Sequence, residues 1–209
     1  MKHRFIVVEG PIGAGKSTLA RLIAERIGAD LILEDPGANP FLPLFYRDMK
    51  RHALSTQMFF LFQRIHQLAG VRQPDLFDKR AVADYMLAKD RLFAKLTLDD
   101  NEYKLYTQLY DHLKPQAPEP DLVIYLQASV DQLLSRIAKR GRSIEKGIGE
   151  DYLTRLSEAY TRHFYEYDES PLLIVNSDRF DFAGNRADFD LLMQRIDTMR
   201  GKREYINAG

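Results

Sequence analysis

The stretch FIVVEGPIGAGKST, Phe5–Thr18, decides the fold. It opens with an unbroken apolar run, Phe5–Val8, which is typical of a strand buried on both faces of a parallel sheet. Gly10–Ser17 then match the pattern G-x-x-x-x-G-K-[ST]. Apolar residues recur at helical spacing over residues 19–27, and Gly28 is a plausible helix end. A strand, a glycine-rich turn and a helix in this order predict a phosphate-binding loop.

The chemistry of this loop follows from its residue types. Glycines let backbone N–H groups turn towards phosphates, and the helix N-terminus adds the positive end of its dipole. We expect Lys16 to reach the terminal phosphates of a nucleoside triphosphate and the Ser17 hydroxyl to join a magnesium shell. An ordinary glycine-rich turn is the alternative, and the flanking strand and helix argue against it. The predicted phosphate-binding residues are Gly10, Pro11, Ile12, Gly13, Ala14, Gly15, Lys16, Ser17 and Thr18.

The rest of the chain alternates strands with helices. Further strands are predicted at 31–33, 81–83, 122–126 and 172–175, and helices at 54–71, 86–96, 101–113, 130–139, 152–167 and 187–199. This alternation predicts an α/β fold of three layers, with a five-stranded parallel sheet and helices on both faces. We expect one domain over residues 1–209, with a flexible tail at about 200–209.

Composition excludes several function classes. The 209 residues carry 30 Lys+Arg and 30 Asp+Glu, so the net charge is zero. A chain that coats nucleic acid or an anionic membrane needs a basic excess, so neither is an expected partner. Cysteine is absent, which excludes disulfides, thiolate zinc sites and cysteine nucleophiles. With no apolar run of membrane-spanning length, we expect a cytoplasmic protein.

Acidic residues follow two of the predicted strands. Glu34-Asp35 ends the strand at 31–33, and Asp84 ends the strand at 81–83. Carboxyl ends of parallel strands meet at one edge, so one carboxylate can help Ser17 hold magnesium while the other takes a proton from a hydroxyl. A carboxylate there would repel an incoming phosphate, so Glu34 favours a hydroxyl acceptor. The alternative is that Glu34 and Asp35 cap the loop before Pro36.

Three arginines lie close together in the segment RIAKRGR. Arg136 and Arg140 are four residues apart and share a helix face, and Arg142 follows. Such a cluster could close over a triphosphate as a lid, at about residues 136–150, and neutralise the charge of the transferring group. A solvated basic helix end is the equally weighted alternative.

Several spacings together resemble the deoxynucleoside kinase family. The family has a glutamate after its second strand, as Glu34 stands in LILEDP, followed by a Tyr, a Gln eleven residues later and an Arg seven further on. Tyr46, Gln57 and Arg64 reproduce this spacing.

The lid of the family also has a counterpart. Its Arg-x-x-x-Arg-Gly-Arg pattern and a following Glu match Arg136, Arg140, Gly141, Arg142 and Glu145. The chain looks like the bacterial branch with deoxyadenosine and deoxyguanosine kinases.

The resemblance implies an enzyme that uses ATP and magnesium to phosphorylate the 5′-hydroxyl of a deoxynucleoside, with purines favoured, in nucleotide salvage. It implies that Glu34 is the general base, that Tyr46 and Glu145 bind the 3′-hydroxyl, that Gln57 binds the base edge and that Arg64 supports base recognition. It also implies a homodimer, and that the loop at 176–182 cradles the adenine of the donor.

One motif departs from the family. After its third strand the family has Asp/Glu-Arg-Ser, whereas this chain has Asp84-Tyr85-Met86. The Arg that steadies the 5′-oxygen and phosphate in the family is therefore missing. Asp84 keeps a carboxylate, predicted to lie near the nucleoside and the metal, and the Asp of the base network falls at Lys89 or Asp90.

Two other functions remain open. A nucleoside monophosphate kinase, such as a thymidylate kinase, would need phosphate contacts that Arg47, Arg51, Arg64 and Arg72 could supply. A nucleotide-binding switch acting through a partner is the second alternative, although the chain has no Asn-Lys-x-Asp guanine signature.

Overall fold

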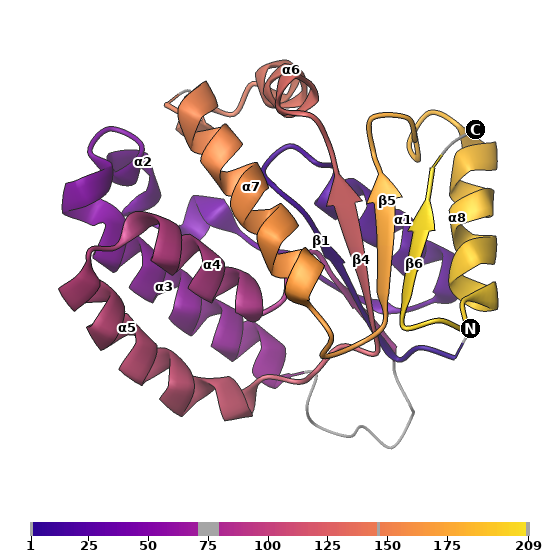
Figure 1. Ribbon diagram of the computed structural model, residues 1–209, viewed down its shortest axis with the longest axis horizontal. Helices are drawn as coiled ribbons and strands as arrows, with labels where there is room; N and C mark the ends of the chain where they lie inside the picture. The colour runs from indigo at the N-terminus through magenta and orange to yellow at the C-terminus, as the bar shows by residue number, and fades with distance from the viewer. Residues whose placement is uncertain (1, 71–79, 146, 208–209) are drawn as a thin grey trace.

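A parallel sheet forms the centre of the computed structural model, which describes residues 2–70, 80–145 and 147–207 (Figure 1). Its strand order is β2-β3-β1-β4-β5-β6, and every pairing is parallel. The strands are β1 Phe5–Glu9, β2 Asp30–Ile32, β3 Ala81–Ala83, β4 Leu122–Gln127, β5 Leu172–Asn176 and β6 Arg203–Ile206. The central strand β1 is buried throughout, as its unbroken apolar run predicts.

The sixth strand corrects the prediction of a five-stranded sheet. β6 lies inside the segment 200–209 and pairs with β5 from Leu172↔Arg203 to Val175↔Ile206. Only Ile206 of this edge strand is buried, and Tyr205 is 59% exposed. A strand with so little buried surface needs no run of apolar residues, so the sequence pattern did not indicate it. Backbone pairing with a neighbouring strand, which hydropathy does not record, holds it in place.

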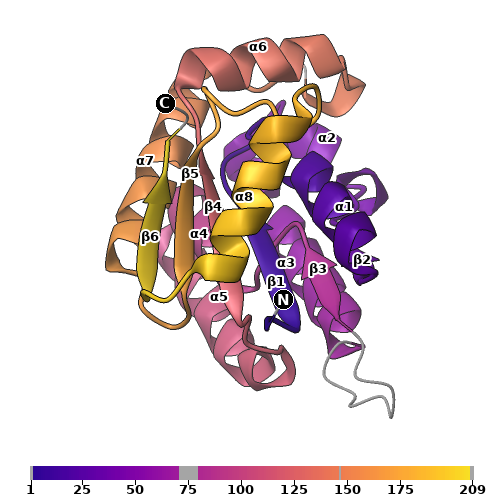
Figure 2. The same cartoon turned by 90° about the vertical axis from the view of Figure 1, so that its right-hand side faces the viewer.

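Helices cover both faces of the sheet, which confirms the three-layer prediction (Figures 1 and 2). One face carries α1 Lys16–Ile27 and α8 Arg186–Thr198; the other carries α3 Met49–Ala69, α4 Ala88–Thr97, α5 Asp100–Leu113 and α7 Glu150–Glu166. Shorter elements are α2 Leu42–Phe45, η1 Pro36–Ala38, η2 Lys114–Gln116 and η3 Ser143–Glu145, and α6 Val130–Arg140 lies beyond the carboxyl ends of the strands. Within the described residues, no helix is both long and apolar enough to cross a membrane.

The helix α3 begins earlier than its apolar pattern predicts. Asp48 precedes it, and its side chain accepts a hydrogen bond from the Arg51 backbone N–H. This cap satisfies one of the free N–H groups of the first turn. The helix then carries Gln57 and Arg64, two residues of the predicted site, towards the carboxyl edge of the sheet.

Candidate active site

The loop between β1 and α1 has the backbone that its glycines allow. Gly10, Gly13 and Gly15 all have positive φ, at 151°, 90° and 99°. A Cβ at Gly10 would lie only 2.6 Å from the Leu126 carbonyl oxygen, so a side chain there would force the loop away from β4. The Lys16 ammonium donates to the Pro11 carbonyl at 3.0 Å and so folds back over the loop.

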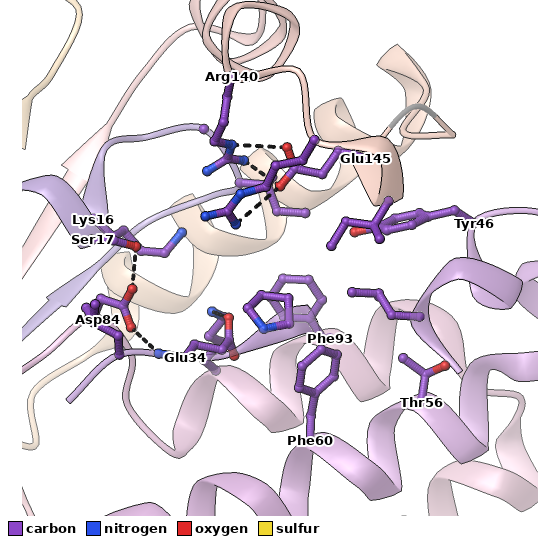
Figure 3. A pocket seen from close by; sticks show the side chains of 18 of the residues that line it. Lys16, Ser17, Glu34, Tyr46, Thr56, Phe60, Asp84, Phe93, Arg140 and Glu145 are labelled. Carbon is purple, nitrogen blue, oxygen red and sulfur yellow. Dashed lines mark hydrogen bonds and ion pairs between the residues drawn. The ribbon is translucent and has the colours of Figure 1, made fainter. Parts of the chain in front are cut away.

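A cavity of about 170 Å³ opens beside this loop (Figure 3). It is bounded by the loop, the ends of β2 and β3, the helices α2, α3 and α4, and the segment after α6. Twelve predicted site residues line it: Ile12, Gly13, Lys16, Ser17, Glu34, Tyr46, Gln57, Arg64, Asp84, Arg140, Arg142 and Glu145. Residues separated by more than 130 positions in the sequence therefore meet in one place.

Arg136 does not line this cavity. Its guanidinium donates to the carbonyls of Ala14 and Ser177, at 3.4 and 2.6 Å, and to the Ser177 hydroxyl at 3.2 Å. It therefore joins the outer side of the phosphate loop to the end of β5. Arg136 and Arg140 face different partners, although they are one helical turn apart. Gly10, Pro11, Ala14, Gly15 and Thr18 also belong to the loop and the start of α1 without lining the cavity.

Glu34 lies between two cations. The Arg64 guanidinium donates to Glu34 Oε1 through Nε, at 2.9 Å, and through Nη2, and Lys89 Nζ donates to Oε2 at 2.9 Å. Burial by itself would raise the pKa of Glu34, but the charges of Arg64 and Lys89 outweigh burial and hold that pKa well below its ordinary value. Glu34 is therefore an ionised carboxylate at any physiological pH.

Arg64 continues this chain of charges into the protein. Its Nη1 donates to Asp90 Oδ2 at 2.5 Å, and the Tyr106 hydroxyl donates to Asp90 Oδ1 at 3.0 Å. Asp90 is completely buried, and burial raises its pKa although Arg64 acts in the opposite direction. Of the two positions that the sequence left open for the aspartate of the base network, Asp90 is the one that pairs with Arg64.

Asp84 connects the phosphate loop with the start of the Glu34 loop (Figure 3). Its Oδ2 accepts from the Ser17 hydroxyl, and its Oδ1 accepts from the Glu34 backbone N–H at 2.8 Å. Among the described residues, no group of three or more His, Asp or Glu could hold a metal ion. One carboxylate and one hydroxyl nevertheless fit Mg²⁺, which commonly takes its other ligands from water and substrate phosphates.

Lys16 is the cation of the phosphate loop. Burial, together with the nearby charge of Lys89, lowers the pKa of Lys16 to about 8. Glu9, Asp84 and Glu34 act in the opposite direction but do not compensate. A polyphosphate beside Lys16 would supply the missing negative charge.

The other end of the cavity is uncharged. Phe60 and Phe93 lie between Glu34 and the distant Thr56 (Figure 3). Gln57 Nε2 lies 3.4 Å from the Thr97 hydroxyl, whose own proton goes to the Phe93 carbonyl. Gln57 Oε1 and Thr56 Oγ1 are buried without a partner among the described residues. Unpaired polar atoms beside two aromatic rings fit a flat ligand with hydrogen-bonding edges.

Glu145 closes the cavity from the lid side. It accepts from Arg140 Nη2 at 2.7 Å and Nε at 3.1 Å, and Arg142 Nη1 lies 3.8 Å away. A Cβ at Gly147 would lie 2.9 Å from Tyr46 Cβ, so the segment after Glu145 packs directly on the end of α2. Burial, with the hydroxyl of Tyr152 and the charge of Glu145 nearby, raises the pKa of Tyr46, which stays a neutral phenol.

Comparisons with known proteins identify the family of this chain. A sequence model of the family described as "Deoxynucleoside kinase" matches residues 6–200. The chain belongs to the deoxynucleoside kinase family. It is an enzyme that transfers a phosphoryl group, with ATP as the donor that the family implies.

The kinase is similar to several bacterial enzymes. It is 38% identical to a deoxyguanosine kinase of Bacillus subtilis, covering 92% of this chain and 95% of that one, and 35% identical to a deoxyadenosine kinase of Lactobacillus acidophilus, covering 92% and 94%. A solved structure of the deoxyadenosine kinase of M. mycoides with bound dATP has a TM-score of 0.81 at 28% identity, covering 94% of this chain and all of that one.

The arginines proposed for a monophosphate kinase do not assemble in the described part of this kinase. Arg47 and Arg51 are exposed and do not line the cavity. The charge of Arg64 is balanced by the carboxylates of Glu34 and Asp90, and Arg72 lies outside the described residues. The phosphate of a monophosphate acceptor would also lie beside the ionised Glu34, which would repel it. The geometry thus disfavours that alternative.

Sequence reasoning missed Lys89, Phe93 and Tyr152 as residues of the cavity. Lys89 and Phe93 are four apart on α4 and share a face, and the ammonium lies 5.7 Å from the ring centre. Their helical spacing was the only available signal. A lysine followed by an aromatic residue one turn later is too common in surface helices to indicate a site.

Proposed function

We propose that this kinase transfers the γ-phosphoryl group of ATP to the 5′-hydroxyl of a purine deoxynucleoside, with magnesium, in nucleotide salvage. One observation carries this proposal: the ionised Glu34 and the phosphate-loop Lys16 line the same small cavity. A carboxylate at this place attracts a neutral hydroxyl and repels an anionic acceptor. The two relatives named for deoxyadenosine and deoxyguanosine support a purine acceptor.

The uncharged end of the cavity would hold the base. Phe60 and Phe93 offer apolar faces to a purine ring, while Gln57 Oε1 and Thr56 Oγ1 lack partners among the described residues. Arg64 has further N–H groups that could reach the base edge. The sugar would then lie between the base and Glu34.

Tyr46 and Glu145 would bind the 3′-hydroxyl of that sugar. The Tyr46 hydroxyl and the Glu145 carboxylate line the same side of the cavity (Figure 3). Glu145 is held by Arg140, and Tyr46 is a neutral donor. A neutral donor and an anionic acceptor together satisfy one hydroxyl group.

Glu34 would accept the proton of the 5′-hydroxyl. Its Oε1 already accepts two N–H groups from Arg64, whereas Oε2 accepts one from Lys89 and keeps room for another. Because its pKa is held low, Glu34 is a weak base that mainly orients the hydroxyl. The proton is transferred once bonding to phosphorus makes it acidic, which suits a loose transition state.

The cations of the site would hold the donor. Lys16 and the loop N–H groups would bind the terminal phosphates, and Arg140 and Arg142 would neutralise the transferring group from the lid. Arg136 would act from the outer side of the loop, beside Ser177. Ser17 and Asp84 would hold magnesium, which supplies positive charge to the phosphate oxygens when bound.

Replacing the glutamate tests the proposal directly. Glu34→Gln keeps the shape but removes the charge, so kcat for a purine deoxynucleoside should fall about 1,000-fold, within the range for general-base groups. ADP formation with deoxyadenosine, deoxyguanosine, the matching ribonucleosides and monophosphates measures both rate and acceptor. A kcat within about threefold of the parent enzyme would remove Glu34 from this role, and ADP release only with monophosphates would overturn the proposed acceptor.

We also propose that two copies pair and act in the cytoplasm. The family resemblance implies a homodimer, and an apolar groove along α3 and η2 offers a surface for it, with Phe62 51% exposed. The cysteine-free chain suits a reducing compartment but does not require it. Light scattering should give twice the mass of 24.2 kDa, and Phe62→Glu should shift the population towards the monomer.

A further inference from the structure

Lys89 is a buried cation beside the reacting groups. It lies in the first turn of α4 and is only 5% exposed. Its ammonium donates to Glu34 Oε2 at 2.9 Å and lines the cavity together with Lys16 and Ser17. An ordinary surface lysine keeps its ammonium in water, so this position calls for an explanation.

The ammonium of Lys89 has unused donors. It carries three N–H groups, and within the described residues the one hydrogen-bond acceptor found for it is Glu34. The ring of Phe93 lies 5.7 Å from the nitrogen on another side. Lys16 is close enough for the two positive charges to interact. Two lysines that repel each other at a cavity wall form a site for an anion.

Tyr85 cannot provide a cation at this place. It stands at the second position of Asp84-Tyr85-Met86, and its hydroxyl donates to Gln67 at 2.7 Å. Burial raises its pKa, so it stays neutral. Lys89, four residues further along the chain, brings to Glu34 the positive charge that Tyr85 lacks.

We propose that Lys89 is a catalytic residue that donates to the acceptor's 5′-oxygen and to the phosphoryl group as it arrives. This rests on the proposed role of Glu34. The 5′-oxygen gives an electron pair to the γ-phosphorus, the bond from that phosphorus to the β-phosphate oxygen breaks, and ADP leaves with the bonding pair. The hydroxyl proton passes to Glu34 Oε2, while Lys89 keeps all its protons.

The geometry supports this contact because Lys89 and the acceptor's 5′-hydroxyl would both donate to Glu34 Oε2. The acceptor hydroxyl would bind Glu34 Oε2, which already accepts from Lys89 at 2.9 Å. An oxygen at hydrogen-bond distance from Oε2 can therefore also accept from the neighbouring ammonium. When the oxygen is esterified, Glu34 repels the new phosphate, whereas Lys89 attracts it. Lys89 thus makes the site tolerate a product that Glu34 alone would expel.

Binding measurements with two ligands separate this role from mere support of Glu34. Lys89→Met should weaken binding of the deoxynucleoside 5′-monophosphate about 30-fold, the size of a hydrogen bond to a charged group, and binding of the deoxynucleoside less than about threefold. Its kcat should fall about 100-fold. Lys95→Met, an exposed lysine on the same helix, is the matched control and should change none of these values.

Equal losses for both ligands would overturn the proposal, because a residue that only holds Glu34 has no means of sensing the phosphate. Lys89→Arg should restore most of the monophosphate binding, and Lys89→Gln should not. If Lys89→Met does not unfold cooperatively on heating, Lys89→Arg and Lys89→Gln are compared in its place. The same ratio of monophosphate affinity to deoxynucleoside affinity in these two variants would reject the role. If neither the parent enzyme nor Lys95→Met phosphorylates deoxynucleosides, the proposed function is rejected instead.

Discussion

Two glutamates of this kinase are each held between two cations, in very different surroundings. Glu34 has a side chain 14% exposed, with Arg64 at 3% and Lys89 at 4%. Glu145 is 8% exposed, but Arg140 is 36% and Arg142 is 48% exposed. The cations of Glu34 are thus inside the protein, whereas those of Glu145 reach into solvent from the lid.

This difference separates a fixed part of the site from an adjustable one. A buried cation that loses its partner stays uncompensated, so the Glu34 cluster can hardly rearrange. Exposed guanidiniums are solvated by water and can exchange Glu145 for a phosphate at little cost. We therefore expect the Glu34 cluster to orient the acceptor and the arginines near Glu145 to respond to the donor.

Breaking the buried cluster should have the largest effect on stability. Arg64→Met removes the cation shared by Glu34 and Asp90 and leaves two buried carboxylates, so the free energy of unfolding should fall by about 3–5 kcal/mol. Urea unfolding followed by circular dichroism measures it. Arg140→Met is the matched control on the exposed side. A loss below about 1 kcal/mol for Arg64→Met would show that the two clusters do not differ.

Breaking the exposed cluster should affect catalysis more than stability. Arg140→Met should lower kcat about 50-fold, because a charge that stabilises the transferring phosphoryl group is lost. It should change the free energy of unfolding by less than about 1 kcal/mol, since Arg142 remains 3.8 Å from Glu145. Steady-state kinetics and urea unfolding of the same preparation check both values. A large loss of stability with unchanged kcat would reverse the assignment.

The smallest expected effect is a dependence of stability on pH. Glu34 has a lower pKa in the folded chain than its ordinary value of about 4.5. The folded state therefore binds fewer protons than the unfolded state, and the stability that Glu34 contributes is present above that value and lost as pH falls through the lowered one. The difference in unfolding free energy between the parent and Glu34→Gln should narrow on going from pH 6 to pH 3. A constant difference would mean that the pKa of Glu34 is not lowered.

The sequence alone predicted the fold and much of the site for a local reason. The phosphate loop is a continuous segment whose glycines permit backbone angles that other residues avoid. Eight adjacent residues therefore determine its conformation. Unbroken apolar runs marked the buried strands. The spacing of Tyr46, Gln57 and Arg64 could be matched because Tyr46 directly follows the short α2 and the long α3 carries the other two.

Only the tertiary structure decided which charges meet. Arg136 and Arg140 lie on the same helix, yet one binds Ser177 and the other Glu145. Lys89 reaches Glu34 across 55 positions of sequence because β2 pairs with β3, so that Glu34 after β2 lies near α4, which follows β3 in the chain. Likewise, β6 forms through backbone bonds to β5, which hydropathy does not show. Local sequence patterns predict the backbone conformation of a segment. The partners of charged side chains depend on elements far apart in the sequence that packing brings together.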